Sequence, residues 1–318
     1  MKILVTPTSF QKQSNSPALS KLLSYSENIV FNEKMRPLKE DELISLIGDC
    51  DGYIAGLDNI TEKVIRSAPK LKVISRYGVG IDSVDLKAAS KRGIIVTNTP
   101  NSNSQAVAEL AIASMFVLAR NLIKLNNTTK EGQWIRNNGI ELANKTLGIL
   151  GIGAIGSRVA IIAKGIGMEV LAIDPCGDVD FCKKFGIELL KNYDELYKIS
   201  DFISLHVPLT ESTYHMIDSD VFSKMKKGSF LINVSRGGLI DEVAAYQALQ
   251  SGSLAGMALD AFEEEPPKSS PLLSLDNVFV TPHTGAHTIE AINLMGQMAV
   301  DNLISVLENK PCQYIVNM

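Results

Sequence analysis

The first part of the chain alternates short apolar, β-branched runs with stretches of helical spacing. Five runs have the length and composition of buried strands, at 2–6, 28–31, 52–55, 71–75 and 94–97. Four amphipathic stretches fall between them, at 16–26, 40–48, 61–67 and 84–92. Strands that alternate with helices in this way pair in parallel, so we expect a small α/β domain here.

The pattern changes after a polar turn at 98–102. A long apolar helix is predicted at 106–125, and a loop-rich passage at 126–145 carries the only tryptophan, Trp134. Six further strands are predicted, at 147–150, 168–173, 201–205, 229–234, 256–260 and 277–281. They predict a second doubly wound sheet.

A second long helix, predicted at 286–307, leaves only the short run 313–316 behind it. The economical interpretation is that this helix returns the chain to the first domain. The expected fold class is therefore α/β, with two doubly wound parallel-sheet domains. The first domain is expected to be discontinuous, at 1–99 and 287–318, and the second to run over 100–286.

Composition and charge narrow the function. The chain has 318 residues, 45% hydrophobic and 21% charged, which is typical of a globular protein with two cores. The formal net charge is −4 and no basic face is evident, so we expect no nucleic-acid partner. The first apolar run is too short for a signal peptide, and charged residues interrupt the apolar region 146–174, so we expect no membrane partner.

The four cysteines, at 50, 176, 182 and 312, have neither a metal-binding nor a disulfide spacing. We therefore expect no metal, and a cytoplasmic location in a reducing compartment. No further domain is expected after residue 318.

A glycine-rich turn joins the strand at 147–150 to a predicted helix. Gly151, Gly153 and Gly156 have the G-x-G-x-x-G spacing of a dinucleotide-binding turn, in which the helix N-terminus faces the pyrophosphate. Alone, the same glycines also fit simple strand–helix packing, and we hold the two interpretations open on the motif by itself.

The next strand shifts the balance because it ends at Asp174, about 20 residues beyond the glycines. A carboxylate there accepts hydrogen bonds from the adenosine ribose and repels the 2′-phosphate of NADP. No arginine follows Asp174 directly; Pro175 and Cys176 do. We therefore predict NAD as the cofactor, with an ordinary strand-end turn as the alternative role for Asp174.

Polar residues suited to catalysis follow four strands of the second sheet. They are His206-Val207-Pro208, Ser235-Arg236-Gly237-Gly238, Asp260 to Pro266, and Pro282-His283-Thr284-Gly285. Ligands of open α/β sheets bind at the carboxyl ends of strands. A guanidinium can hold a carboxylate and polarise a neighbouring carbonyl, and an imidazole oriented by a carboxylate can transfer a proton. Together these groups suit reduction of a carbonyl by hydride transfer.

Several ordered motifs carry a resemblance to a known family. They are Tyr77 to Asp82, Asn98 to Asn101, Val107 to Leu110, the glycine motif, Asn233 to Gly238, Leu259 to Phe262 with Glu265-Pro266, and Pro282 to Ala286. The chain resembles the D-isomer-specific 2-hydroxyacid dehydrogenases, most of all the phosphoglycerate dehydrogenase branch. The resemblance implies a Rossmann NAD domain, a smaller flavodoxin-like substrate domain, a cleft between them that closes, and a homodimer built on the NAD domains.

The resemblance also implies residue roles. Arg236 would bind the substrate carboxylate and carbonyl, His283 would be the acid/base, and Glu265 its partner. Further substrate contacts are expected from Arg76, Tyr77, Gly78, Val79 and Gly80. The expected cofactor-binding residues are Gly151, Gly153, Ala154, Ile155, Gly156, Asp174, His206, Val207, Pro208, Val234, Ser235, Asp260 and Gly285.

Each assignment has a structural alternative. Arg236 also fits a surface ion pair. His206 lies at a strand end, where it can line the adenine site, whereas His215 and His287 are expected to be structural or exposed. Glu263 and Glu264 are expected to be solvated neighbours of Glu265.

The substrate is less well defined. Phosphoglycerate enzymes of this type place basic residues in the loop after the third strand, and here 55–59 reads Ala-Gly-Leu-Asp-Asn. Two candidate phosphate ligands remain. One is Arg76, and the other is Arg136, if the Trp134 loop reaches the cleft of a neighbouring subunit. We expect 3-phosphoglycerate first, then glyoxylate or hydroxypyruvate, and no serine feedback.

Two other functions compete with this one. The same fold serves in corepressor-like proteins that sense NADH and report it to a partner. The intact Arg236, Glu265 and His283 argue against that use. A formate dehydrogenase is disfavoured because Glu265 would place a negative charge beside a small anion.

Overall fold

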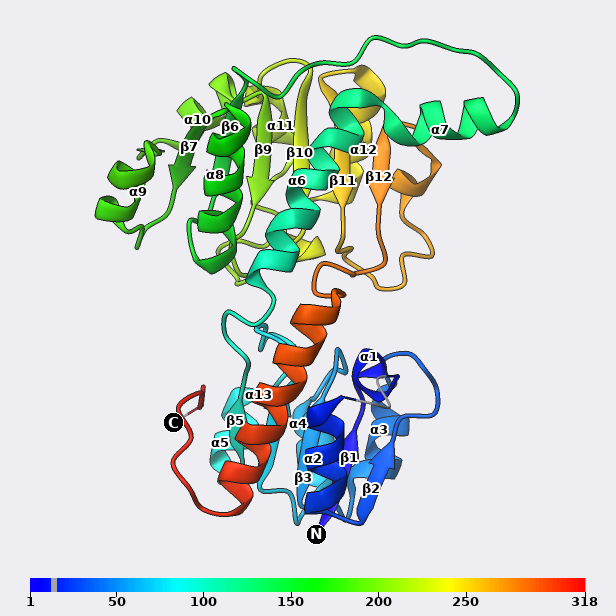
Figure 1. Ribbon diagram of the computed structural model, residues 1–318, viewed down its shortest axis with the longest axis vertical. Coiled ribbons are helices and arrows are strands. Elements are labelled where there is room, and N and C mark those ends of the chain that lie inside the picture. Colours follow the sequence, from blue (N-terminus) through cyan, green and yellow to red (C-terminus); the bar gives the residue numbers. More distant parts are fainter. Residues whose placement is uncertain (13–15, 318) are drawn as a thin grey trace. The chain divides into compact units, whose positions relative to one another are not determined.

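The computed structural model describes residues 1–12 and 16–317. The chain divides into two compact units, Met1–Asn103 with Ala286–Met318, and Ser104–Gly285. Unit 1 is thus made from two separate stretches of chain, joined through α13 (Ile289–Leu307), while unit 2 is one continuous stretch (Figure 1). The junctions lie within a few residues of the expected boundaries at 99 and 287.

Unit 1 contains a five-stranded sheet in the order β2-β1-β3-β4-β5, in which every pairing is parallel. Its strands are β1 (Lys2–Val5), β2 (Asn28–Phe31), β3 (Gly52–Ala55), β4 (Val73–Arg76) and β5 (Ile95–Thr97). Besides α13, its helices are α1 (Thr8–Gln11), α2 (Pro17–Tyr25), α3 (Glu40–Ile47), α4 (Glu62–Ser67) and α5 (Leu86–Lys91). All five predicted strands and all four predicted helices are confirmed.

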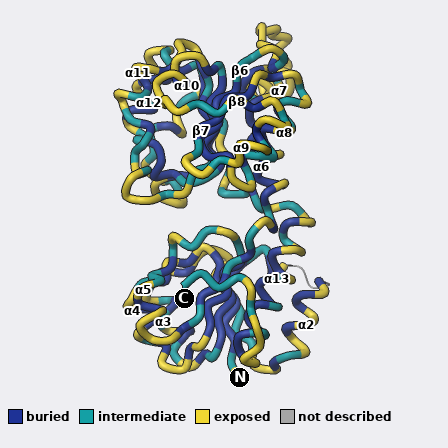
Figure 2. The backbone as a smooth tube through the Cα atoms, turned by 90° about the vertical axis from the view of Figure 1, so that its left-hand side faces the viewer, coloured by how far each residue is buried: buried dark blue, intermediate teal, exposed yellow. Residues whose placement is uncertain are grey.

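The sheet of unit 1 is buried between two helical layers. Figure 2 shows α2 and α13 on one side of the buried strands and α3, α4 and α5 on the other. The side chains of β3 and β4 are buried along their whole length, as expected of parallel strands covered on both faces. Helices on both faces leave the loops at the strand ends as the places where polar side chains are free to bind ligands.

Unit 2 contains a seven-stranded parallel sheet in the order β12-β11-β10-β9-β6-β7-β8. Its strands are β6 (Thr146–Leu150), β7 (Glu169–Ile173), β8 (Glu188–Leu189), β9 (Phe202–Leu205), β10 (Ser229–Asn233), β11 (Leu254–Leu259) and β12 (Val278–Val280). The order reverses at β6, which is therefore the switch point where α/β sheets bind ligands.

Helices cover both faces of this sheet (Figures 1 and 2). One core lies under α6 and α8, and the other under α10, α11 and α12. The helices are α6 (Ser104–Arg120), α7 (Leu122–Lys130), α8 (Ala154–Ile166), α9 (Val179–Phe185), α10 (Tyr193–Ile199), α11 (Ser219–Lys224) and α12 (Glu242–Ser251), with short 3₁₀ turns at Gly237–Leu239 and Pro271–Ser274.

The region after α6 differs from the prediction. The expected single helix 106–125 is broken at Asn121, whose φ of 52° is left-handed, and the chain bends by 62° into α7. The predicted loop therefore begins at Glu131 rather than at residue 126. Asparagine adopts this backbone conformation more readily than other non-glycine residues. The helix can therefore break here without a glycine, and no glycine marks the break in the sequence. Within the described residues no single helix could span a membrane; only α6 and α7 together reach the required length and hydropathy.

The glycine turn after β6 depends on two glycines for different reasons. Gly151 has a φ of 92°, and a Cβ on it would lie 2.6 Å from the carbonyl oxygen of His206. A Cβ on Gly156, in the first turn of α8, would lie 2.0 Å from the carbonyl oxygen of Gly151. Gly153 faces open space instead, since a Cβ on it would have no atom of the described residues within 4 Å.

We predict that Gly156→Ala destabilises unit 2 by roughly 1–3 kcal/mol, because the added methyl group forces α8 away from the turn. Gly153→Ala, the matched control, meets open space and is expected to change the free energy of unfolding by less than about 1 kcal/mol. Urea unfolding followed by circular dichroism measures both. Equal stability of the two variants would contradict this account of the turn.

Candidate active site

Three polar side chains follow adjacent strands of unit 2. Arg236 comes after β10, Glu265 lies in the loop after β11, and His283 follows β12. These three strands are neighbours in the sheet and run parallel, so their carboxyl ends share one edge. The sequence-based expectation that these residues lie at one edge therefore agrees with the sheet order.

Glu265 and His283 form a direct pair. The imidazole Nδ1 of His283 lies 2.9 Å from both carboxylate oxygens of Glu265. The side chains are partly exposed, at 27% for His283 and 34% for Glu265. Because Nδ1 is held by the carboxylate, Nε2 is the nitrogen that can exchange a proton with a substrate.

The backbone of His283 is held in an unusual conformation by Asp260. His283 has a φ of 53°, in the left-handed region. Asp260 is 2% exposed, and one of its oxygens accepts bonds from Thr281 Oγ1 at 2.6 Å and from the N–H of Thr284 at 2.7 Å. Its other oxygen accepts the N–H of Gly285 at 2.7 Å. The carboxylate therefore hydrogen-bonds to the turn on both sides of His283.

The turn that carries Arg236 is fixed in the same manner. Asn233 accepts the N–H of Ser235 at 3.0 Å and donates its amide to the carbonyl of Arg236 at 2.8 Å. Ser235 Oγ donates to the carbonyl of Val207 at 2.7 Å, which ties the ends of β9 and β10 together. A Cβ on Gly237 would lie 1.8 Å from the carbonyl carbon of Phe262, so only glycine lets this turn touch the loop that leads to Glu265.

The residues expected to bind the cofactor include the glycine turn after β6 and Asp174 after β7, at the carboxyl ends of the other strands of this sheet. The carboxylate of Asp174 accepts the N–H of Ile152 at 2.8 Å through one oxygen and the N–H of Cys176 at 2.8 Å through the other. It therefore sits against the glycine turn, where α8 begins at Ala154. The open position at Gly153, the helix N-terminus and this carboxylate suit a pyrophosphate and a ribose, so the residues present fit a dinucleotide.

His206 adds a buried polar atom at this edge. Its Nε2 lies 2.8 Å from Ser204 Oγ, and its Nδ1 is buried with no hydrogen-bond partner among the described residues. Burial lowers the pKa of His206 to about 3, so the ring is neutral near pH 7. Val207 and Pro208 follow β9, and Val207 Cγ1 would lie 3.0 Å from a Cβ on Gly151. Val234 follows β10, the next strand of the sheet.

The substrate residues expected in unit 1 form a braced turn after β4. Gly78 has a φ of 145°, and its N–H donates to Thr99 Oγ1 at 3.1 Å. Asn98 donates its side-chain amide to the carbonyl of Val79 at 2.9 Å. Val79 is 36% exposed. The polar sequence 98–101 thus acquires a structural role, since it holds this turn in place.

Arg76 supports the same turn from beneath. It is 3% exposed, and its Nε donates to the carbonyl of Gly80 at 3.1 Å while Nη1 donates to the carbonyl of Ala55 at 2.8 Å. Its guanidinium therefore links the ends of β3 and β4 by hydrogen bonds to the backbone. The expectation that Arg76 contacts the substrate is not supported by this burial.

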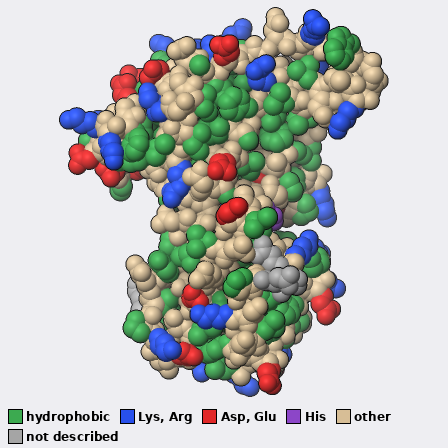
Figure 3. Space-filling model, viewed as in Figure 1, with side chains coloured by type: hydrophobic (Ala, Val, Ile, Leu, Met, Phe, Trp, Pro, Cys, Tyr) green, Lys and Arg blue, Asp and Glu red, His purple; other side chains and the backbone are tan. Residues whose placement is uncertain are grey.

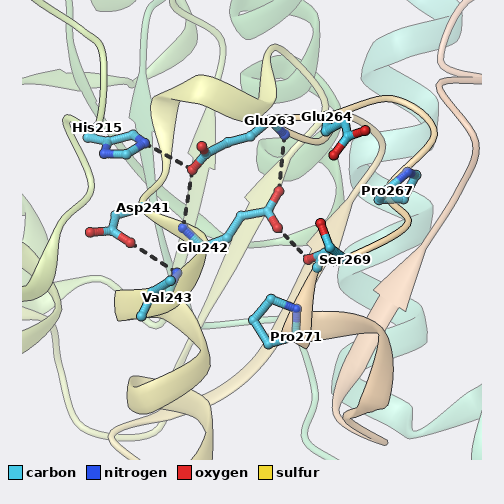
Figure 4. A pocket seen from close by; sticks show the side chains of 10 residues that line it. His215, Asp241, Glu242, Val243, Glu263, Glu264, Pro267, Ser269 and Pro271 are labelled. Carbon is cyan, nitrogen blue, oxygen red and sulfur yellow. Dashed lines mark hydrogen bonds and ion pairs between the residues drawn. The ribbon is translucent and has the colours of Figure 1, made fainter.

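A bracket of carboxylates that the sequence did not reveal holds the loop of Glu265. One oxygen of Glu242, in the first turn of α12, accepts the N–H of Glu263 at 3.0 Å, and the other accepts the hydroxyl of Ser270 (Figure 4). Glu263 in turn contacts His215 Nε2 at 2.9 Å. Glu242 thus fastens the loop on both sides of Glu265. Glu263 and Glu264 are both exposed, as expected, and Glu263 is in addition held by its contacts with His215 and Glu242.

This bracket borders a pocket of about 320 Å³. Carboxylates of Asp241, Glu242, Glu263 and Glu264 line it (Figure 4). Across the residues that the structure describes, no group of three or more potential metal ligands is arranged to hold a metal ion. The carboxylate of Glu242 that lines the pocket holds the loop of Glu265 in place.

Comparisons of the whole chain with known proteins show which proteins it is related to. The family model described as "D-isomer specific 2-hydroxyacid dehydrogenase, NAD binding domain" matches residues 112–285. The chain is 42% identical, over its whole length, to a D-3-phosphoglycerate dehydrogenase of Methanocaldococcus jannaschii, of which it spans only 60%. It is 39% identical to a glyoxylate reductase of Korarchaeum cryptofilum, with 94% of this chain and 92% of that protein covered.

A solved structure extends the likeness to the fold. The D-lactate dehydrogenase of Aquifex aeolicus, determined as a complex with NAD and lactic acid, is 30% identical. It superposes with a TM-score of 0.87 and covers 100% of this chain and 99% of its own. NAD is accordingly the cofactor of this fold, and the expectation of NAD is confirmed.

We predict that Glu242→Ala lowers kcat roughly tenfold and changes the KM for NADH little, because the loop of Glu265 loses both of its fastenings. Glu242→Gln should recover most of the rate, since the amide oxygen still accepts the Glu263 N–H and the Ser270 hydroxyl can reverse its role. The matched control is Glu195→Ala, an exposed glutamate in the first turn of α10. Equal kcat in Glu242→Ala and the control would show that the bracket does not position Glu265.

Proposed function

Since the chain belongs to the D-isomer-specific 2-hydroxyacid dehydrogenase family, we propose that it interconverts a 2-oxo acid and a (2R)-2-hydroxy acid. The observation that carries this proposal is the Glu265–His283 pair, 2.9 Å apart, at the sheet edge that also bears Arg236. The first substrate pair is 3-phosphoglycerate and 3-phosphohydroxypyruvate. Glyoxylate and hydroxypyruvate come next.

Each residue has a separate task in this reaction. Arg236 holds the substrate carboxylate through paired N–H donors and polarises the adjacent carbonyl. His283 gives a proton from Nε2 to the carbonyl oxygen during reduction and takes it back during oxidation, while Glu265 stabilises the protonated ring. The nicotinamide, when bound, gives or takes the hydride. The turn at Val79 and Gly80 offers backbone N–H groups to the substrate carboxylate.

The cofactor contacts belong to the same proposal. The glycine turn and the start of α8 receive the pyrophosphate, and Asp174 receives the ribose hydroxyls. His206, Val207 and Pro208 lie along the adenosine half, while Val234, Ser235, Asp260 and Gly285 lie along the nicotinamide half. Support comes from the open position at Gly153 and from the unpartnered Nδ1 of His206.

A panel of 2-oxo acids tests this function. Oxidation of NADH is followed at the cofactor absorbance band with phosphohydroxypyruvate, hydroxypyruvate and glyoxylate, and kcat/KM should be highest for phosphohydroxypyruvate. Arg236→Lys should lower kcat/KM about 10- to 100-fold for every substrate, because an ammonium cannot reproduce the paired hydrogen bonds. Arg120→Lys, at the exposed end of α6, serves as the matched control.

Other outcomes of the panel would favour the rival functions. A higher kcat/KM for glyoxylate or hydroxypyruvate would make the protein a reductase of those acids. NADH binding without turnover of any small 2-oxo acid would favour a corepressor-like sensor of NADH, and it would overturn the assignment of Arg236, Glu265 and His283 to catalysis.

We also propose a homodimer formed through unit 2. Large apolar side chains are exposed along α6, α7 and the loop that follows, with Trp134 79% exposed. The others are Phe116, Leu122, Ile123, Ile135 and Ile140. Figure 3 shows apolar side chains gathered on the face of unit 2 where α6 and α8 lie. Exposed apolar surface of this kind is typical of subunit interfaces.

Light scattering tests the dimer. The protein should have a mass of twice 34.5 kDa, and Leu122→Glu combined with Trp134→Glu should shift it to the monomer, because two buried charges destabilise an interface. Leu23→Glu, at a residue of α2 that is 51% exposed, is the control and should leave the mass unchanged. A monomeric parent protein would contradict the proposal.

We also propose that the protein is located in the cytoplasm. All four cysteines are free thiols, as is usual in a reducing compartment.

A further inference from the structure

A phosphorylated substrate needs cationic or hydrogen-bonding groups for its phosphate, and the expected loop after β3 does not supply them. The only charged residue in that loop, Asp58, is 1% exposed. Its carboxylate accepts the hydroxyl of Tyr53 at 2.9 Å and the N–H of Leu38 at 2.7 Å, as well as the hydroxyl of Thr6. The loop is therefore tied inward by an anion, and the site of the phosphate must be sought elsewhere.

Arg76, the other cation near this loop, is committed to the protein backbone. Its bonds to the carbonyls of Ala55 and Gly80 and its 3% exposure place the guanidinium beneath the turn. Moving it toward a ligand would break both bonds and leave buried carbonyls unsatisfied. A phosphate held within unit 1 would therefore need a cation other than Arg76.

A pocket of about 310 Å³ in the same unit contains such a cation. It is lined by Thr8, Ser9, Lys12, His287 and Ile292. The volume is about ten times the ~30 Å³ share of one water molecule, which is enough for a phosphate group and some of its hydration. Among the described residues that line it, Thr8 contributes a hydroxyl, Lys12 an ammonium and His287 an imidazole, and none of them is a carboxylate.

The pocket adjoins the turn that is proposed to receive the substrate carboxylate. Tyr77, which begins that turn, donates its hydroxyl to the carbonyl of Ile292 at 3.1 Å and is hydrogen-bonded to Ser9. Burial raises the pKa of Tyr77 to about 12, so the phenol stays neutral beside an anion. Ser9 and Ile292 therefore connect the pocket wall directly to the first residue of the turn.

We propose that the pocket formed by Thr8, Ser9, Lys12 and His287 binds the phosphate of a phosphorylated 2-oxo acid. Lys12 supplies the positive charge, and the hydroxyl of Thr8 donates a hydrogen bond to a phosphate oxygen. The hydroxyl of Ser9 donates to Tyr77 and so fixes the pocket wall against the turn. The inference rests on the proposed dehydrogenase function and adds the residues that select the substrate. It assigns the choice of a phosphorylated acid to the loop after β1 rather than to the loop after β3.

The test compares two substrates that differ only in the phosphate. The ratio of kcat/KM for phosphohydroxypyruvate to that for hydroxypyruvate should fall at least about tenfold in Lys12→Gln, because a charge-assisted contact is lost. Lys12→Arg should keep most of the ratio. Lys70→Gln, at an exposed lysine between α4 and β4, is the matched control and should leave the ratio unchanged. An unchanged ratio in Lys12→Gln, or an equal loss with both substrates, would overturn the proposal.

A binding measurement separates this proposal from the proposed function. Inorganic phosphate is titrated into the protein by calorimetry with NADH present, so that the pyrophosphate site is filled. Binding should weaken at least about tenfold in Lys12→Gln and stay the same in Lys70→Gln. If the protein turns over no 2-oxo acid but shows this Lys12-dependent binding, the proposed function fails and the phosphate pocket stands. Phosphate binding that is absent, or independent of Lys12, would overturn the pocket.

Discussion

The buried carboxylate of Asp260 is the interaction on which the candidate active site depends. At 2% exposure it accepts hydrogen bonds from Thr281, Thr284 and Gly285. A buried charge is costly unless it is hydrogen-bonded, so these bonds stabilise the anion and the turn together. The turn places His283 in a left-handed conformation that a histidine rarely adopts. With the backbone of His283 fixed in this way, Glu265 contacts Nδ1 of the ring, and Nε2 is not engaged by that pair.

The same physical solution recurs around the sheet edge. Asn233 holds the turn of Arg236, Asp174 holds the glycine turn, and Glu242 holds the loop of Glu265, each by accepting backbone N–H groups. A side chain that binds backbone can fix a loop without regular secondary structure. The candidate site residues of this unit are therefore held in place by polar side chains that bind the backbone of their loops.

Much of this arrangement was predictable because it depends on local patterns. Buried parallel strands give continuous apolar runs, and the glycine spacing reports a close approach that the structure measures as 2.0 Å between a Cβ on Gly156 and the Gly151 carbonyl. The order of strands then places Arg236, Glu265 and His283 at one edge. The bend at Asn121 and the bracket of Glu242 were missed. The first depends on one left-handed residue without a glycine, and the second joins residues 21 and 28 positions apart through contacts that leave no periodic pattern.

Arg76 and Arg236 illustrate why the substrate was harder to predict than the reaction. Both are arginines that follow or end a strand in a motif shared with the family, but Arg76 is 3% exposed and bound to two carbonyls, whereas Arg236 is only partly buried. Sequence shows the guanidinium and not its surroundings. Burial makes Arg76 a support for the turn at Gly80, whereas Arg236 follows β10 at the sheet edge that also carries His283. The proposal for the phosphate therefore rests on a cation of unit 1 that remains exposed, Lys12.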